Sequence, residues 1–96
     1  MKFIHFDGHA TLTFRQLDAL NDAPKGTSFR RFRAMVEQLR EGRDYFHLSA
    51  DEHAELIASL QRDQLAYPGT PHVVLITEAG YRRMRQSGDQ PDQAQG

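Results

Sequence analysis

The chain has 96 residues, of which 39% are hydrophobic and 26% are charged, a composition that predicts a single globular domain. Its 12 basic and 13 acidic side chains leave a formal net charge of −1, which excludes a polycationic nucleic-acid coat. Cysteine is absent, which excludes disulfides and thiolate metal sites, and no apolar run is long enough to span a membrane. A cytoplasmic protein with no membrane partner is therefore expected.

The first elements that the sequence predicts are a strand, a tight turn and a short helix. Residues 2–6 have the character of a strand that ends at Asp7-Gly8, a dipeptide typical of tight turns, and a second short extended piece follows. Thr13 and Gln16 have the spacing of a capping box, which begins a helix over about 14–21. The apolar residues of this helix recur at helical spacing: Phe14, Leu17 and Leu20.

A cluster of turn-forming residues over 21–26 separates this helix from a second one. From Thr27 onward the apolar residues are spaced as on one helical face: Phe29, Phe32, Val36 and Leu39. The pattern predicts a second helix over about 27–40 that buries this stripe and ends near Gly42 at its C-cap.

The second half of the chain predicts two further strands and two helices. Residues 44–48 are rich in aromatic side chains and predict a strand, after which Ser49-Ala50-Asp51-Glu52 forms a capping box for a helix to about Arg62. Residues 67–71 predict a loop, residues 72–76 a buried strand, and Thr77 can cap a last helix. Residues 1–87 are thus expected to form one domain, and residues 88–96 a disordered tail.

Basic charge is concentrated around the second helix. Residues 25–43 hold six basic side chains against Glu37 and Glu41. The helix face opposite the apolar stripe carries Thr27, Arg30, Arg31, Ala34 and Gln38, with Arg33 at its margin. Arginine and glutamine read guanine and adenine, threonine can hold a phosphate, and alanine lets the backbone approach DNA. A solvated helix with salt bridges to its neighbours is the alternative interpretation.

Neither a metal site nor a catalytic site is predicted. The five histidines show no pair at metal-ligand spacing on a helix, and His53 falls on the same helix face as Ile57 and Leu60, which predicts a partly buried side chain. Lys25-Gly26-Thr27-Ser28 lacks the preceding glycine of a phosphate-binding loop. No cofactor and no enzymatic activity are expected.

Five segments resemble the ORF6N-type domain, which is found at the N-termini of phage antirepressor-like proteins and is similar in role to the KilA-N and BRO-N domains. The matching segments lie in order within about residues 11–85: Leu17-Asp18-Ala19-Leu20, Pro24-Lys25-Gly26-Thr27, Arg30-Arg31-Phe32, Glu41-Gly42-Arg43-Asp44-Tyr45-Phe46 and Leu75-Ile76-Thr77-Glu78-Ala79-Gly80-Tyr81. The resemblance implies a phage or prophage origin, DNA binding and transcriptional regulation. Such domains often precede a separate effector domain, whereas this chain stops at Gly96, and the family tends to continue apolar where this chain has Arg82-Arg83-Met84-Arg85.

Together these observations predict an α+β fold, a small winged-helix-like domain with a helix-turn-helix and short β-strands, which binds double-stranded DNA with the helix of about 27–40 in the major groove. The candidate DNA-binding residues are Lys25, Thr27, Arg30, Arg31, Arg33, Gln38, Arg40 and Arg43. The residues Arg82, Arg83 and Arg85 either contact phosphates or only solubilise an end helix. Paired operator half-sites favour a homodimer, although no heptad pattern indicates one. The alternative function is a small protein-interaction module, a phage factor whose basic helix docks on an acidic host or repressor surface.

Overall fold

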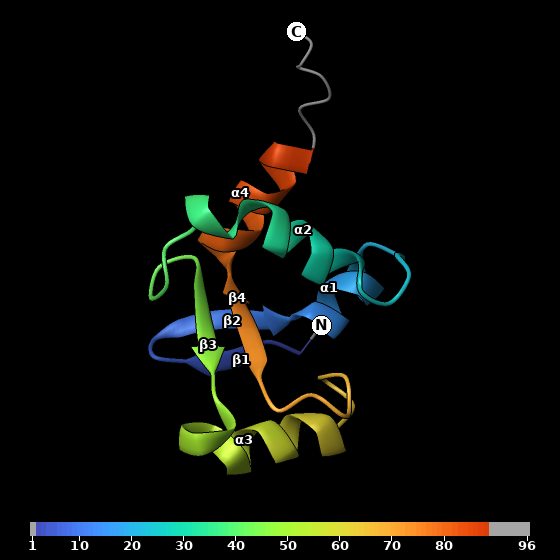
Figure 1. Cartoon of the computed structure of the whole chain (residues 1–96), viewed down its shortest axis with the longest axis vertical. Helices are drawn as coiled ribbons and strands as arrows, with labels where there is room; N and C mark the ends of the chain where they lie inside the picture. Colours follow the sequence, from blue (N-terminus) through green and yellow to red (C-terminus); the bar gives the residue numbers. More distant parts are fainter. Residues whose placement is uncertain (1, 89–96) are drawn as a thin grey trace, which may run out of the picture.

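Four strands form one antiparallel sheet in the order β1-β2-β4-β3 in a computed structural model, which describes residues 2–88 (Figure 1). The strands are β1 (Ile4–Phe6), β2 (His9–Thr13), β3 (Tyr45–Leu48) and β4 (Val73–Thr77). The helices are α1 (Phe14–Leu20), α2 (Thr27–Met35), α3 (Ala50–Arg62) and α4 (Glu78–Gly88), with a 3₁₀ turn over Val36–Gln38. The predicted α+β class is confirmed.

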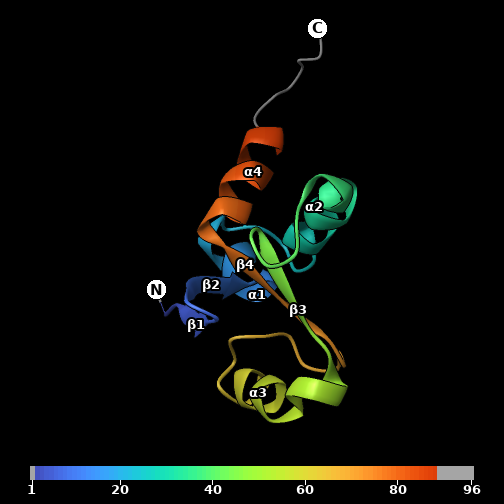
Figure 2. The same cartoon turned by 90° about the vertical axis from the view of Figure 1, so that its left-hand side faces the viewer.

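Both faces of the sheet are covered, because side chains alternate along each strand. In β4, Val73 and Leu75 join a core cluster with α3, whereas Val74 and Ile76 pack toward a second cluster that contains residues of α1, α2 and α4. Figures 1 and 2 show α3 at one end of the molecule and α2 and α4 at the other. A central strand that is buried on both sides needs a continuous apolar sequence, which explains the run at residues 73–76.

The predicted Asp7-Gly8 turn and the predicted helix caps at Thr13 and Ser49 are confirmed. Asp7 (φ 51°) and Gly8 (φ 81°) both adopt left-handed backbone in the turn that joins β1 to β2. Thr13 and Gln16 form the reciprocal capping box of α1. At α3, the Ser49 hydroxyl accepts a hydrogen bond from the Glu52 amide at 3.4 Å, as expected of its N-cap.

The second helix is shorter than predicted. The expected range of about 27–40 is wrong because α2 ends at Met35 and a 3₁₀ turn follows to Gln38. Leu39 is already extended (φ −105°, ψ 153°), and the backbone amide of Arg40 donates to the buried Asp44 carboxylate at 2.9 Å. Gly42 therefore lies in a separate turn and does not cap the helix. The Asp44 carboxylate that holds this amide is itself paired with Arg83 of α4, a contact that no local pattern in the sequence indicates.

Phe32, Val36 and Leu39 of the predicted apolar stripe pack in the core, but Phe29 does not. Phe29, expected to be buried, is 44% exposed, whereas Ser28 is only 6% exposed. Phe32 and Met35 are buried as the next residues of the actual inward face. Phe29 instead packs edge-to-face on Phe14, with ring centroids 5.7 Å apart. Leu20 is likewise 47% exposed, although it has the spacing of the α1 stripe.

The outer edge of β3 is hydrogen-bonded by the loop that precedes it. The amide of His47 donates to the Glu41 carboxylate at 3.0 Å, and the amide of Gly42 donates to the carbonyl of Tyr45 at 2.7 Å. The opposite edge of β3 pairs with β4 in the register Tyr45 to Ile76 and Leu48 to Val73. Both edges of this strand therefore have partners within the chain.

The burial predicted for His53 and Met84 in the second half of the chain is confirmed. His53 is half-buried as expected, at a kink inside α3 (φ −132°), and its ring lies 5.6 Å from that of Phe6. Met84 is buried in α4 as predicted. The predicted tail of residues 88–96 lies outside the described residues except for Gly88, the last residue of α4. No helix among residues 2–88 is long and apolar enough to cross a membrane.

Candidate nucleic-acid interface

The outer face of α2 carries the arginines that the sequence predicted to contact DNA. Arg30, Arg31, Arg33 and Ala34 are all exposed, and Gln38 is exposed in the 3₁₀ turn that follows. Figure 2 shows α2 on the outside of the molecule, beside α4. Thr27 is half-buried at the start of the helix, where its hydroxyl accepts a long hydrogen bond of 3.5 Å from Arg30.

The start of α2 is held by a carboxylate from α1. Asp18 is 2% exposed, and its carboxylate accepts hydrogen bonds from the amides of Gly26 (3.0 Å) and Ser28 (2.8 Å) and from the Tyr67 hydroxyl (2.7 Å). Burial alone would raise the pKa of Asp18, but these hydrogen bonds lower it below its ordinary value. The ionised carboxylate caps the helix and fixes α1 against α2.

The arginines divide into those that have acidic partners and those that do not. Arg43 and Arg83 form ion pairs with Asp44, and Arg82 pairs with Glu78 on the same helix. Among residues 2–88, none of the arginines of α2 forms an ion pair, and neither does Arg40. The positive charge of α2 is therefore left uncompensated within the described structure.

Asp44 organises the loop between the 3₁₀ turn and β3. Its carboxylate is fully buried and accepts from Arg43 Nη2 at 2.8 Å, from Arg43 Nε at 3.2 Å and from the Arg40 amide at 2.9 Å. Arg83 Nε lies 3.3 Å away. Burial would raise the pKa of Asp44, but the hydrogen bonds and the two guanidinium groups lower it. Arg43, predicted to contact DNA, thus has a structural partner, although its side chain is still 42% exposed.

Two segments that carry the family resemblance meet at this loop. The Thr77 amide donates to the carbonyl of Asp44 at 3.1 Å, and the Thr77 hydroxyl donates to the carbonyl of Arg43 at 2.6 Å. The same hydroxyl accepts from the Gly80 amide at 3.1 Å. Residues 41–46 and 75–81 therefore form one hydrogen-bonded unit, a connection that no local pattern in the sequence indicates.

The remaining predicted residues lie around the two ends of α2. Lys25 Nζ lies 5.0 Å from the centre of the Tyr67 ring, and Arg33 Cζ lies 5.7 Å from that of Phe29. Arg40 is exposed in the turn beyond Gln38. In α4, Arg85 lies over the Tyr81 ring at 5.8 Å, a contact of the same kind as that of Arg33 with Phe29.

Residues 2–88 contain no group of three histidine, cysteine, aspartate or glutamate side chains arranged to hold a metal ion. His47 and His72 stack with their ring centroids 5.0 Å apart, a contact that the sequence analysis missed because the two residues lie on different elements. Comparison of the chain with protein-family models, with curated proteins and with solved structures found no match in any of the three.

Proposed function

We propose that this protein is a DNA-binding transcriptional regulator of the ORF6N type, with α2 as the helix that enters the major groove. The observation that carries this proposal is the uncompensated charge of α2. Arg30 and Arg31 are exposed on a helix held rigidly at its start by Asp18, and neither has an acidic partner in residues 2–88. Phosphates and base edges supply the partners that such arginines lack.

The arrangement of elements supports a helix-turn-helix. α1 and α2 are joined by a turn over residues 21–26 and pack against each other. After α2, the strands β3 and β4 pair antiparallel, with α3 between them in the sequence, and we propose that they serve as the β part of a winged-helix-like domain. In this arrangement Arg30, Arg31 and Gln38 face the groove, and Lys25, Thr27 and Arg40 hold phosphates.

The experiment is a fluorescence-anisotropy titration of the protein with a pool of random duplex DNA at low and at moderate salt. The test variant carries Arg30→Ala and Arg31→Ala. The matched control carries Lys2→Ala and Arg62→Ala, which remove the same charge from exposed positions outside α2. We expect salt-sensitive binding that the control retains and the test variant loses. Equal binding by the two variants, or no binding at low salt, would contradict the proposal and favour an acidic protein partner.

A further inference from the structure

A hollow of about 520 Å³ lies between α2 and the segment that leads into β4. Its walls include the rings of Phe14, Phe29, Phe32 and Tyr67, together with Pro68 and Pro71. The volume falls within the range of about 300–1,000 Å³ that is typical of small-molecule sites. We call this hollow the α2 groove.

The charged side chains that line the α2 groove are basic. Lys25 and Arg33 both belong to its lining, which contains no aspartate or glutamate among residues 2–88. Each cation lies against an aromatic wall, Lys25 over Tyr67 and Arg33 over Phe29. Neither side chain forms an ion pair within residues 2–88. A ligand that fits this lining combines an aromatic body with a negative charge.

The aromatic body is better matched by a hydrocarbon ring system than by a nucleobase. Apart from the cations, most of the lining is aromatic, proline or aliphatic, and the polar rings of His47 and His72 stack on each other at 5.0 Å. The Thr13 hydroxyl in the lining already bonds Leu65 and Gln16, so a nucleobase placed there would have few hydrogen-bond partners for its edge. An apolar ring in the same position has no polar edge and therefore loses no hydrogen bonds to water when it binds.

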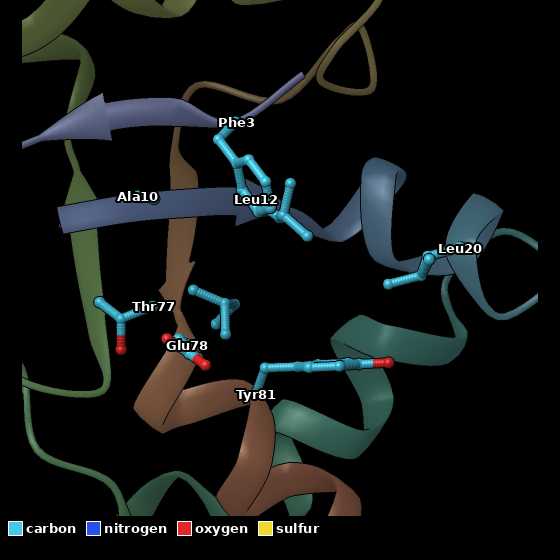
Figure 3. A pocket seen from close by; sticks show the side chains of 8 residues that line it. Phe3, Ala10, Leu12, Leu20, Thr77, Glu78 and Tyr81 are labelled. Carbon is cyan, nitrogen blue, oxygen red and sulfur yellow. The ribbon is translucent and has the colours of Figure 1, made fainter. Parts of the chain in front are cut away.

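A second hollow provides an internal comparison. It has a volume of about 400 Å³ and lies between β2, α1 and α4, where Phe3, Leu20 and Tyr81 line it (Figure 3). This hollow is also apolar, but the charged residue in its lining is Glu78. The two hollows thus share apolar walls and differ in the sign of their charge, so an anionic ligand should distinguish them.

We propose that the α2 groove binds an aromatic organic acid, with its rings between Phe29 and Tyr67 and its acid group beside Lys25 and Arg33. This inference does not depend on the proposed DNA binding, because it rests on the shape and charge of the groove alone. Lys25 and Arg33 nevertheless belong both to the lining of the α2 groove and to the candidate DNA-binding residues. A ligand in the groove would therefore lie next to the helix proposed to contact DNA.

The test compares two fluorescent probes that differ by one charge: 8-anilinonaphthalene-1-sulfonate and its uncharged analogue N-phenyl-1-naphthylamine. The chain has no tryptophan, and its three tyrosines do not absorb at the longer wavelengths that excite either probe. Each is titrated into the whole protein without DNA. We expect saturable binding of the sulfonate at one site, and weaker binding of the neutral probe.

Variants locate the site and assign its charge. Lys25→Gln and Arg33→Gln should each weaken sulfonate binding by about two- to fivefold and leave the neutral probe unaffected, as for a partly exposed ion pair. Phe29→Ser should weaken both probes, because it removes an apolar wall; Phe29 is 44% exposed, so the fold should tolerate this change. Phe3→Ser and Leu20→Ser, in the second hollow, are the matched controls and should change nothing.

Competition separates an apolar acid from a nucleotide. We expect 1-naphthoate to displace the sulfonate probe and adenosine monophosphate not to do so. Equal affinity for the charged and neutral probes, insensitivity to Lys25→Gln and Arg33→Gln, loss of binding in the Phe3 or Leu20 variant, or equal displacement by the nucleotide would each overturn the inference.

Discussion

Gly80 lies so close to Asp44 that a Cβ atom added at Gly80 would come within 1.9 Å of the Asp44 carbonyl oxygen. In an uncrowded helix, glycine to alanine stabilises by about 0.5–1 kcal/mol. Here the contact is with backbone, which cannot rotate away as a side chain would. We therefore expect Gly80→Ala to lower the free energy of unfolding by about 1–3 kcal/mol or more, the opposite of its effect in an uncrowded helix. Urea unfolding measures this difference, and a stabilised variant would contradict the contact.

The Asp18 cap should be required for stability. In Asp18→Asn the carboxamide NH₂ faces the donors of Gly26, Ser28 or Tyr67, so at least one buried donor loses its acceptor. We expect a loss of about 1–3 kcal/mol in the free energy of unfolding at neutral pH. Asp63→Asn, at an exposed position, is the matched control and should leave stability unchanged.

The two buried carboxylates should dominate the acid side of the stability profile. The pKa values of Asp18 and Asp44 are both lower in the folded protein than the ordinary 3.8. Their stabilisation is therefore fully present above that value and is lost as the pH falls through the lower folded values. Unfolding measured from about pH 5 down to about pH 2, a range that includes the ordinary value of 3.8, should show this loss. A profile of Asp18→Asn with the wild-type slope would contradict the assignment.

Tyr67 should titrate later than an ordinary tyrosine. Burial, together with its hydrogen bond to Asp18, raises the pKa of Tyr67 to about 12. Because the folded value lies above the ordinary 10.0, the contribution of Tyr67 to stability is present below pH 10 and is lost as the pH rises toward 12. Ultraviolet absorbance of the phenolate should show a late phase that Tyr67→Phe removes. A phase at about pH 12 that persists in this variant would contradict the assignment to Tyr67. Burial also raises the pKa of Tyr45, so Tyr45→Phe is the control that identifies its separate contribution.

Arg30 and Arg43 should separate DNA binding from stability. Arg30 makes no ion pair within residues 2–88, so Arg30→Ala should cost about 1–3 kcal/mol in DNA binding, relax specificity at one base, and leave unfolding unchanged. Arg43→Ala leaves the buried Asp44 with Arg83 as its remaining ion-pair partner and should instead lower stability. Equal weakening on all DNA sequences would show that Arg30 contacts only phosphate.

The salt dependence of DNA binding gives an independent count of phosphate contacts. The logarithm of the binding constant should fall by about 0.9 for each unit increase in log salt and for each phosphate neutralised. A residue that contacts phosphate, as proposed for Arg40, should reduce this slope by about one unit when replaced by alanine. An unchanged slope in Arg40→Ala would remove that residue from the interface.

The elements of this fold that could be predicted are those that local chemistry determines. The Asp7-Gly8 turn and the caps at Thr13 and Ser49 depend on residues within a few positions of each other. The strand at residues 73–76 is apolar because both its faces are buried. The exposed arginines of α2 were also predicted, since a strongly basic helix face is unfavourable in a core.

Features that depend on distant residues could not be predicted in the same way. Asp44, which holds the Arg40 amide beyond the end of α2, is also paired with Arg83 from α4, and only the folded chain makes that contact. The exposure of Phe29 follows from where Phe14 lies, which helical periodicity does not describe. Likewise the α2 groove joins Lys25 to Tyr67, residues on different elements that only the folded chain brings together.

The hydrogen bonds of Glu41 and Gly42 to β3 also affect how copies of the protein can associate. An unpaired strand edge is a template on which another chain can add a strand, and proteins often block such edges with charge or with a loop. Here the chain uses both, since a loop lies along β3 and its Glu41 carboxylate binds the His47 amide. The sheet is therefore closed to strand addition at these positions, and two copies that met there would do so through side chains, without forming a continuous sheet.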